Sequence, residues 1–165
     1  MSDHVTRILD QWAVERPDLD VGPVALIGRL HRLAERLAWE LTTVYRRFGL
    51  AEGDFDALAS LRRQGEPFAL TCSALADATM ITSGGMTKRI DRLVDAGLVR
   101  RRESESDGRS RLVELTPAGR ALVDEAFTAH IANEHRLVGV LDPAERAQLT
   151  ALIAAWSDRL ERNAT

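Results

Sequence analysis

The side chains best suited to a chemical task lie on a segment that is predicted to form a helix from Thr82 to Gly97. Threonine is a favoured helix N-cap, and glycine commonly ends a helix. The apolar residues of this segment recur at helical spacing and should pack inward; they are Met86, Ile90, Leu93 and Val94. Gly84, Thr87 and Lys88 then face outward, where they could approach base edges in a DNA major groove. A solvated surface helix would look similar, so this helix alone does not decide the function.

The segments on either side of this helix extend the pattern. A shorter helix is predicted after Thr71, which can cap it, and a tight turn through residues 79–81 follows. Residues 98–103 and 111–115 alternate enough to form two strands, and residues 104–110 between them are rich in turn formers. Helix, turn, helix and hairpin in this order predict a winged helix-turn-helix with a two-stranded wing.

The charge distribution agrees with a nucleic-acid partner. Residues 86–111 contain eight basic and five acidic side chains, whereas the whole chain of 165 residues carries a formal net charge of −3. The remainder of the chain is therefore acidic. A basic region on an acidic body is expected of a protein that meets phosphate with one surface only.

The run SGGMTKRIDRLVDAGLVRRRESESDGRSRLVELTPAGR resembles the winged helix of MarR-type bacterial transcription regulators. Its most specific marks are Asp107 and Arg109 in the wing and the Leu-Thr-Pro-x-Gly motif at 115–119. The resemblance implies that Arg109 enters the minor groove and that Asp107 holds the wing's shape. The expected contacts to DNA are Ser83, Thr87 and Lys88 on base edges, Thr71 and Ser73 on phosphates, and in addition Gly84, Arg92 and Arg109.

The remaining segments are predicted to be helices that pair two such heads. They are a short amphipathic helix over residues 3–15, a long helix from 23 to about 48, a helix over 54–63, one from Pro117 to about 141 and a last one that begins at Pro143. The last helix has an apolar stripe with little sequence left to cover it. We therefore expect a mainly α homodimer, with a dimerisation lobe at 1–48 and 117–165 and a DNA-binding lobe at 50–116. Its recognition helices should lie about one duplex turn apart, roughly 34 Å.

The N-terminal extension resembles the urate-responsive branch of MarR-type regulators, which has an added helix. The resemblance carries the ligand residues of that branch to Trp12, Asp56 and Arg89. A planar anionic heterocycle suits an aromatic wall, a guanidinium fork and an acceptor. Urate, another purine, or a different small anion or phenolic compound should then weaken DNA binding. Other interpretations stay open: Trp12 as an apolar anchor, Arg89 as a phosphate contact or ion-pair member, and Asp56, Ser60 and Arg63 as a solvated face.

Other classes of function have weaker support. His130 and His135 are five residues apart and do not share a helix face, although with Glu134 they could form a weak metal site. Cys72, at the first turn of a helix, could act as a redox sensor. A protein-interaction adaptor is a further alternative. No enzyme motif, cofactor signature, secretion signal or membrane span is evident, so a cytoplasmic protein without catalytic residues, metal or cofactor is expected.

Overall fold

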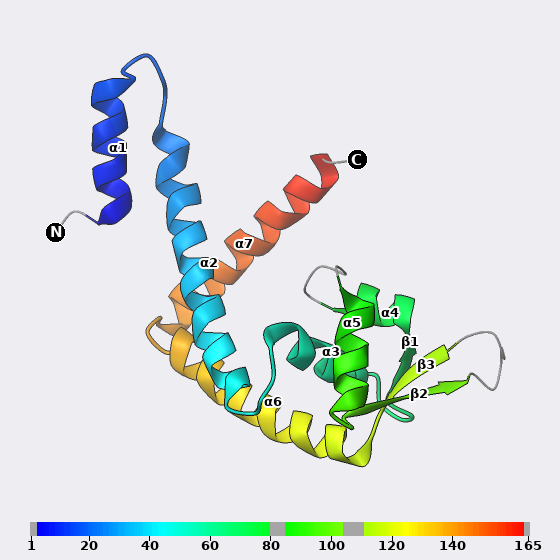
Figure 1. The fold of residues 1–165 in the computed structure, drawn as a ribbon. Coiled ribbons are helices and arrows are strands. Elements are labelled where there is room, and N and C mark those ends of the chain that lie inside the picture. The colour runs from blue at the N-terminus through cyan, green and yellow to red at the C-terminus, as the bar shows by residue number, and fades with distance from the viewer. Residues whose placement is uncertain (1–2, 80–84, 104–110, 164–165) are drawn as a thin grey trace.

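The computed structural model describes residues 3–79, 85–103 and 111–163. Over these residues the chain is mainly helical, and the predicted winged helix-turn-helix fold is confirmed. The elements are α1 (His4–Glu15), α2 (Gly22–Arg46), α3 (Glu52–Arg63), β1 (Ala69–Thr71), α4 (Cys72–Ala78), α5 (Met86–Asp95), β2 (Val99–Glu103), β3 (Arg111–Leu115), α6 (Pro117–Val138) and α7 (Pro143–Asn163). Figure 1 shows α1 beside the N-terminal half of α2, with the winged helix-turn-helix at the opposite end of the molecule.

The winged helix-turn-helix is built on a small antiparallel sheet with the order β1-β3-β2. The predicted wing strands pair from Val99 opposite Leu115 to Glu103 opposite Arg111. Strand β1 pairs with the other edge of β3 and was not predicted. Helices α3, α4 and α5 cover the sheet through the fully buried side chains of Leu58, Leu61, Leu75 and Ile90, and Val113 of β3 is equally buried beneath them.

The start of α6 fixes that helix to the sheet. Thr116 caps α6, because its Oγ accepts a hydrogen bond from the backbone N–H of Gly119 at 3.0 Å, and Pro117 occupies the first turn. The Thr116 hydroxyl also donates to the carbonyl of Gly97 at 2.7 Å. Gly119 lies so close to the carbonyl of Leu98 that a Cβ at position 119 would clash with it. The Leu-Thr-Pro-x-Gly motif therefore acts as a helix start and a close backbone contact.

An aromatic junction joins the long helices to the winged helix-turn-helix, and we define it as Tyr45, Phe55, Phe127 and His130. The rings of Tyr45 and Phe55 stack with centroids 4.1 Å apart. The Tyr45 hydroxyl lies 3.1 Å from Nδ1 of His130, within hydrogen-bond distance. Burial raises the pKa of Tyr45 far above its usual value, and the negative charge of Glu134 acts in the same direction. Helices α2, α3 and α6 thus meet at this junction.

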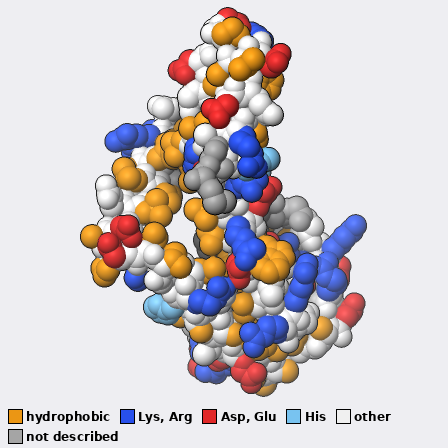
Figure 2. Space-filling model, turned by 90° about the vertical axis from the view of Figure 1, so that its left-hand side faces the viewer, with side chains coloured by type: hydrophobic (Ala, Val, Ile, Leu, Met, Phe, Trp, Pro, Cys, Tyr) orange, Lys and Arg blue, Asp and Glu red, His pale blue; other side chains and the backbone are white. Residues whose placement is uncertain are grey.

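Several helices carry apolar faces that no other part of the described chain covers. Helix α7 has no buried residue, although its sequence has an apolar stripe. The large apolar side chains that stay exposed on α1, α2 and α7 include Trp12, Leu26, Ile27, Leu33, Trp39, Leu152, Ile153 and Leu160. Figure 2 shows exposed apolar side chains over the face that is turned to the viewer. No helix among the described residues has the length and apolarity that a membrane crossing requires.

Candidate nucleic-acid interface and effector site

Helix α5 presents the polar face that the sequence predicts. Its N-cap is Gly85, whose φ of +87° is a left-handed conformation that suits glycine. Met86, Ile90 and Leu93 are buried, as predicted. Thr87, Lys88 and Arg92 are exposed on the other side of the helix. The prediction of Thr82 as the cap of this helix is wrong, because the helix begins at Met86 with Gly85 as its cap. Thr82 and the predicted contacts Ser83 and Gly84 lie outside the described residues.

Side-chain hydrogen bonds hold both ends of helix α4. Its own cap residue holds the N-terminal end, and two side chains of α3 hold the C-terminal end. The Thr71 Oγ accepts a hydrogen bond from the backbone N–H of Ala74 at 3.1 Å, which confirms the predicted N-cap. Ser73 is exposed in the first turn. At the C-terminal end, the Ala78 carbonyl accepts from the Ser60 hydroxyl at 3.3 Å and from the Arg63 guanidinium. Ser60 is fully buried, so the interpretation of this side of α3 as a solvated face is wrong for Ser60.

The wing contains arginines that are held by carboxylates. Glu114 on β3 is buried, and its two oxygens accept from Arg100 at 2.5 Å and from Arg102 at 2.9 Å. Arg101 points the other way and pairs with Asp91 on α5. These ion pairs connect β2 to β3 and to α5. Asp107 and Arg109, the predicted wing residues, lie outside the described residues.

Arg89 on α5 points inward toward α3, as its helical angle indicates. Its side chain is 13% exposed, and its Nε lies 3.9 Å from Oδ1 of Asp54. The same carboxylate oxygen accepts a hydrogen bond from Nη2 of Arg92 at 2.9 Å. The Nε and Nη1 atoms of Arg89 are buried without a hydrogen-bond partner among the described residues. Asp54 was not predicted from the sequence, because an acidic residue in the first turn of a helix is usual and does not indicate its tertiary partner.

The three predicted ligand residues do not converge within one chain. Asp56 and Arg89 lie in the winged helix-turn-helix, on α3 and α5. Trp12 lies on α1, which packs along the N-terminal half of α2 at the other end of the molecule (Figure 1). Its side chain is 48% exposed. Arg89 therefore lies close to α3, whereas Trp12 of the same chain is distant from both Arg89 and Asp56.

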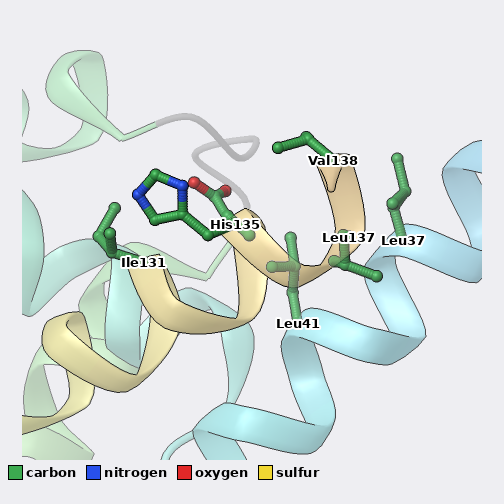
Figure 3. A pocket seen from close by; sticks show the side chains of 7 residues that line it. Leu37, Leu41, Ile131, His135, Leu137 and Val138 are labelled. Atoms are coloured by element: carbon green, nitrogen blue, oxygen red, sulfur yellow. The ribbon is translucent and has the colours of Figure 1, made fainter. Parts of the chain in front are cut away.

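A separate apolar pocket lies between α2 and α6 (Figure 3). It has a volume of about 460 Å³, and its lining consists of leucine, isoleucine and valine side chains with two polar residues at the rim. The lining residues are Leu37, Leu41, Ile131, Glu134, His135, Leu137 and Val138. Such a lining suits an apolar or aromatic group rather than a metal ion.

The geometry gives little support to the two alternative predictions, a metal site at His130 and His135 and a redox sensor at Cys72. Nε2 of His130 lies 3.2 Å from Glu134, and Nδ1 faces Tyr45. His135 belongs to the apolar pocket. Within residues 3–79, 85–103 and 111–163, no cluster of three or more His, Cys, Asp or Glu side chains could hold a metal ion. Cys72 is exposed and forms no disulfide.

Comparison with known proteins assigns the chain to a family. The MarR family profile matches residues 48–110. Over 159 residues, which cover 96% of each chain, the sequence is 38% identical to the HTH-type transcriptional regulator PecS of Dickeya dadantii (strain 3937). The chain belongs to the MarR family. It is therefore a DNA-binding transcriptional regulator and not an enzyme.

Solved structures of other regulators share the fold. One is BpsR of Bordetella bronchiseptica, from a study of how 6-hydroxynicotinic acid regulates its DNA binding. It is 30% identical, with a TM-score of 0.69, and the match covers 84% of this chain and 94% of BpsR. Another is AbsC, a MarR-family regulator from Streptomyces coelicolor, with 27% identity, a TM-score of 0.73 and coverage of 87% of this chain and 97% of AbsC.

Proposed function

We propose that this MarR-family protein is a homodimeric repressor that binds a pseudopalindromic operator and leaves it when a small anionic or aromatic ligand such as urate binds. The observation that carries the proposal is helix α5. One of its sides is buried in the core, its opposite side exposes Thr87, Lys88 and Arg92, and a buried arginine lies between the two. This arrangement could present one helix to DNA and to an effector at the same time.

The proposed DNA contacts follow from the exposed face of α5 and from its neighbours. Thr87 and Lys88 would meet base edges, with Ser83 and Gly84 before them. Thr71 can cap α4 and still donate its hydroxyl hydrogen to a phosphate oxygen, because a hydroxyl both accepts and donates. Ser73 and Arg92 would add phosphate contacts, and Arg109 of the wing would enter the minor groove with Asp107 supporting the wing.

A second copy of the chain would cover the apolar faces of α1, α2 and α7. These faces belong to residues 1–48 and 117–165, which we propose as the dimerisation lobe, whereas residues 50–116 form the DNA-binding lobe. Exposed apolar surface of this extent favours association, because its burial removes it from water. A two-fold dimer would set its recognition helices for two half-sites about one duplex turn apart, roughly 34 Å.

The proposed effector site includes Trp12, Asp56 and Arg89. Arg89 supports an anionic ligand, since two of its buried nitrogens lack a hydrogen-bond partner in the described chain. BpsR, the relative regulated by 6-hydroxynicotinic acid, supports a planar aromatic ligand. Because Trp12 is apart from Arg89 in the same chain, a site with all three residues requires either a movement of α1 or α1 of the second copy.

A phenolic effector is the second candidate. The apolar pocket between α2 and α6 favours it, because leucine and isoleucine side chains would cover an aromatic ring while Glu134 or His135 at the rim could bind a hydroxyl. The two candidate sites differ in location, and an Arg89 variant separates them. Such a variant should lose the response to an anionic ligand bound at Arg89 but keep the response to a phenolic ligand bound between α2 and α6.

One set of experiments on the full chain tests this proposal. Genomic fragments bound at low salt would be selected, and the mass of the complex would be measured by light scattering. Urate and a phenolic acid would then be titrated while operator binding and tryptophan fluorescence are followed. We expect a dimer on duplex DNA that urate releases. A protein that ignores every fragment would remove the proposal, whereas release by the phenolic acid alone would assign the effector to the second candidate.

A further inference from the structure

Asp54 lies where α3 faces the recognition helix α5, and two arginines of α5 share its carboxylate. Oδ1 accepts a hydrogen bond from Arg92 Nη2 at 2.9 Å and lies 3.9 Å from Arg89 Nε. The side chains of Asp54 and Arg89 are each 13% exposed, whereas that of Arg92 is 59% exposed. Since 3.9 Å is too long for a hydrogen bond, the carboxylate is hydrogen-bonded to the exposed Arg92 and forms only a longer ion pair with the buried Arg89.

Arg89 is confined on its other side by the backbone of α3. Gly53 leaves the space that the Arg89 guanidinium fills, and a Cβ at position 53 would overlap that group. Nε and Nη1 of Arg89 are buried and have no hydrogen-bond partner among the described residues. A buried N–H of a charged group that lacks an acceptor destabilises the state in which it occurs. Arg89 should therefore take an acceptor whenever one becomes available.

We infer that Asp54 exchanges Arg92 for Arg89 when the protein binds DNA. The inference rests on the proposed DNA binding through α5. A phosphate attracts the exposed Arg92, because guanidinium groups form strong charge-assisted hydrogen bonds with phosphate oxygens. The released carboxylate of Asp54 then closes onto Nε of Arg89, which is already adjacent to it. Asp54 is thus a positioning residue that acts on DNA through the two arginines.

This exchange gives an anionic effector a route to the DNA contact. An anion that binds Arg89 supplies its missing acceptor, so that Asp54 gains nothing by leaving Arg92. Arg92 then stays on Asp54 and away from the phosphate. The same carboxylate would make effector binding and DNA binding oppose each other, and the size of the effect is set by the difference in effector affinity between the two states.

A double-mutant cycle tests the exchange. Wild type, Asp54→Asn, Arg92→Gln and the double variant would be compared in their affinity for a duplex of about 30 base pairs and arbitrary sequence at low salt, where phosphate contacts dominate binding. Asp54→Asn frees Arg92 from competition, so we expect binding roughly three- to tenfold tighter than wild type. In the Arg92→Gln background, Asp54→Asn should change affinity little, because the competing arginine is absent.

Two other results of the cycle would overturn the inference. An equal gain in both backgrounds would mean that Asp54 acts only by its charge near DNA. Weaker binding by a folded Asp54→Asn protein would mean that Asp54 has a purely structural role. Asp54→Glu keeps the carboxylate and should bind as wild type does, and thermal melting reports whether each variant is folded. Failure of wild type to bind the duplex would instead remove the proposed function and this inference with it.

A measurement on wild type does not depend on the variants. The Nε–Hε resonance of Arg89, assigned from an Arg89→Lys spectrum, should shift and exchange more slowly with water once the duplex is bound, because a new acceptor protects it. An Arg89 resonance that stays unchanged on a saturated complex would contradict the exchange, whatever the affinities of the variants.

Discussion

Single polar side chains hold this protein together at points where its helices cross. The Tyr45 hydroxyl and His130 meet in the aromatic junction, and Ser60 and Arg63 both donate to the Ala78 carbonyl at the end of α4. Each contact joins segments that are distant in sequence. Removal of one partner leaves the other buried without a bond, which usually costs more free energy than the bond itself contributes.

Tyr45→Phe should destabilise the protein at neutral pH by about 1 to 2 kcal/mol, because His130 loses its partner in a mostly buried place. Urea unfolding followed by circular dichroism measures the change. Phe48→Leu, a partly buried apolar substitution on the neighbouring turn, controls for repacking without loss of a hydrogen bond. A loss no larger than that of the control would show that the hydrogen bond contributes little.

The same tyrosine predicts a pH dependence. Burial raises the pKa of Tyr45 in the folded state above its ordinary value of 10.0, so the unfolded chain loses this proton first as pH rises. The stability that depends on the neutral hydroxyl is fully present below pH 10 and decreases above it. The difference in unfolding free energy between wild type and Tyr45→Phe should therefore shrink as the pH rises from 10 to about 11. A constant difference over this range would contradict the raised pKa.

Sequence patterns predicted which residues of α5 face inward, but they did not predict which carboxylate lies beside Arg89. Met86, Ile90 and Leu93 follow helical spacing, and the inward tilt of Arg89 follows from the same geometry. Asp54 could not be predicted in the same way, because its contact with α5 depends on how two helices cross. The burial of Ser60 depends on α4 in the same manner.

At the scale of elements, the longer segments were predictable and the shortest was not. The caps at Thr71 and Thr116 are local hydrogen bonds, which is why both helix starts are confirmed. Strand β1 has three residues and exists because β3 offers a free edge opposite Ala69–Thr71. Such a strand has no periodicity of its own, and only the tertiary fold reveals it.

Helix α7 carries a prediction about assembly. Leu152 is 62% exposed in the single chain, and in the proposed dimer it would be covered by the second copy. Leu152→Glu should weaken the dimer on the order of tenfold to a hundredfold, because a charge would have to be buried at the interface. Sedimentation equilibrium at several micromolar concentrations measures this change.

Ala147→Glu is the matched control for that experiment, since it adds the same carboxylate to an exposed position of α7 on the side opposite the apolar stripe. It should leave the association constant within a factor of about two. An equal effect of the two variants would contradict the assignment of Leu152 to the interface, and a monomeric wild type would contradict the dimer itself.

At the scale of the molecule, charge and apolar surface lie on different parts of the chain. The basic side chains of α5 and β2 belong to the winged helix-turn-helix, and the uncovered apolar faces belong to α1, α2 and α7. The charge count in the sequence overstated the free positive charge of the wing, because Glu114 and Asp91 hold three of its arginines. The exposed face of α5 should consequently contribute more to the proposed DNA recognition than the arginines of β2 do.

Lys88→Ala should reduce the preference for the selected operator over an arbitrary duplex by about tenfold, since a contact to a base edge contributes to discrimination rather than to general affinity. Fluorescence anisotropy with both duplexes at one salt concentration measures the ratio. Arg7→Gln, which removes a cation from exposed α1, should leave the ratio unchanged. Equal losses on both duplexes would place Lys88 on a phosphate instead.

Strand β3 ends at Leu115 and helix α6 begins at Pro117, so the single residue Thr116 connects them. The Thr116 hydroxyl is bonded to Gly97, and the close fit of Gly119 against Leu98 leaves no slack at this point. This connection leaves no residue free to act as a hinge. Strands β2 and β3 should therefore move as one rigid body with the 22 residues of α6. In the proposed dimer, a small change in the angle between α6 and the second copy would accordingly be magnified into a much larger displacement of β2 and β3.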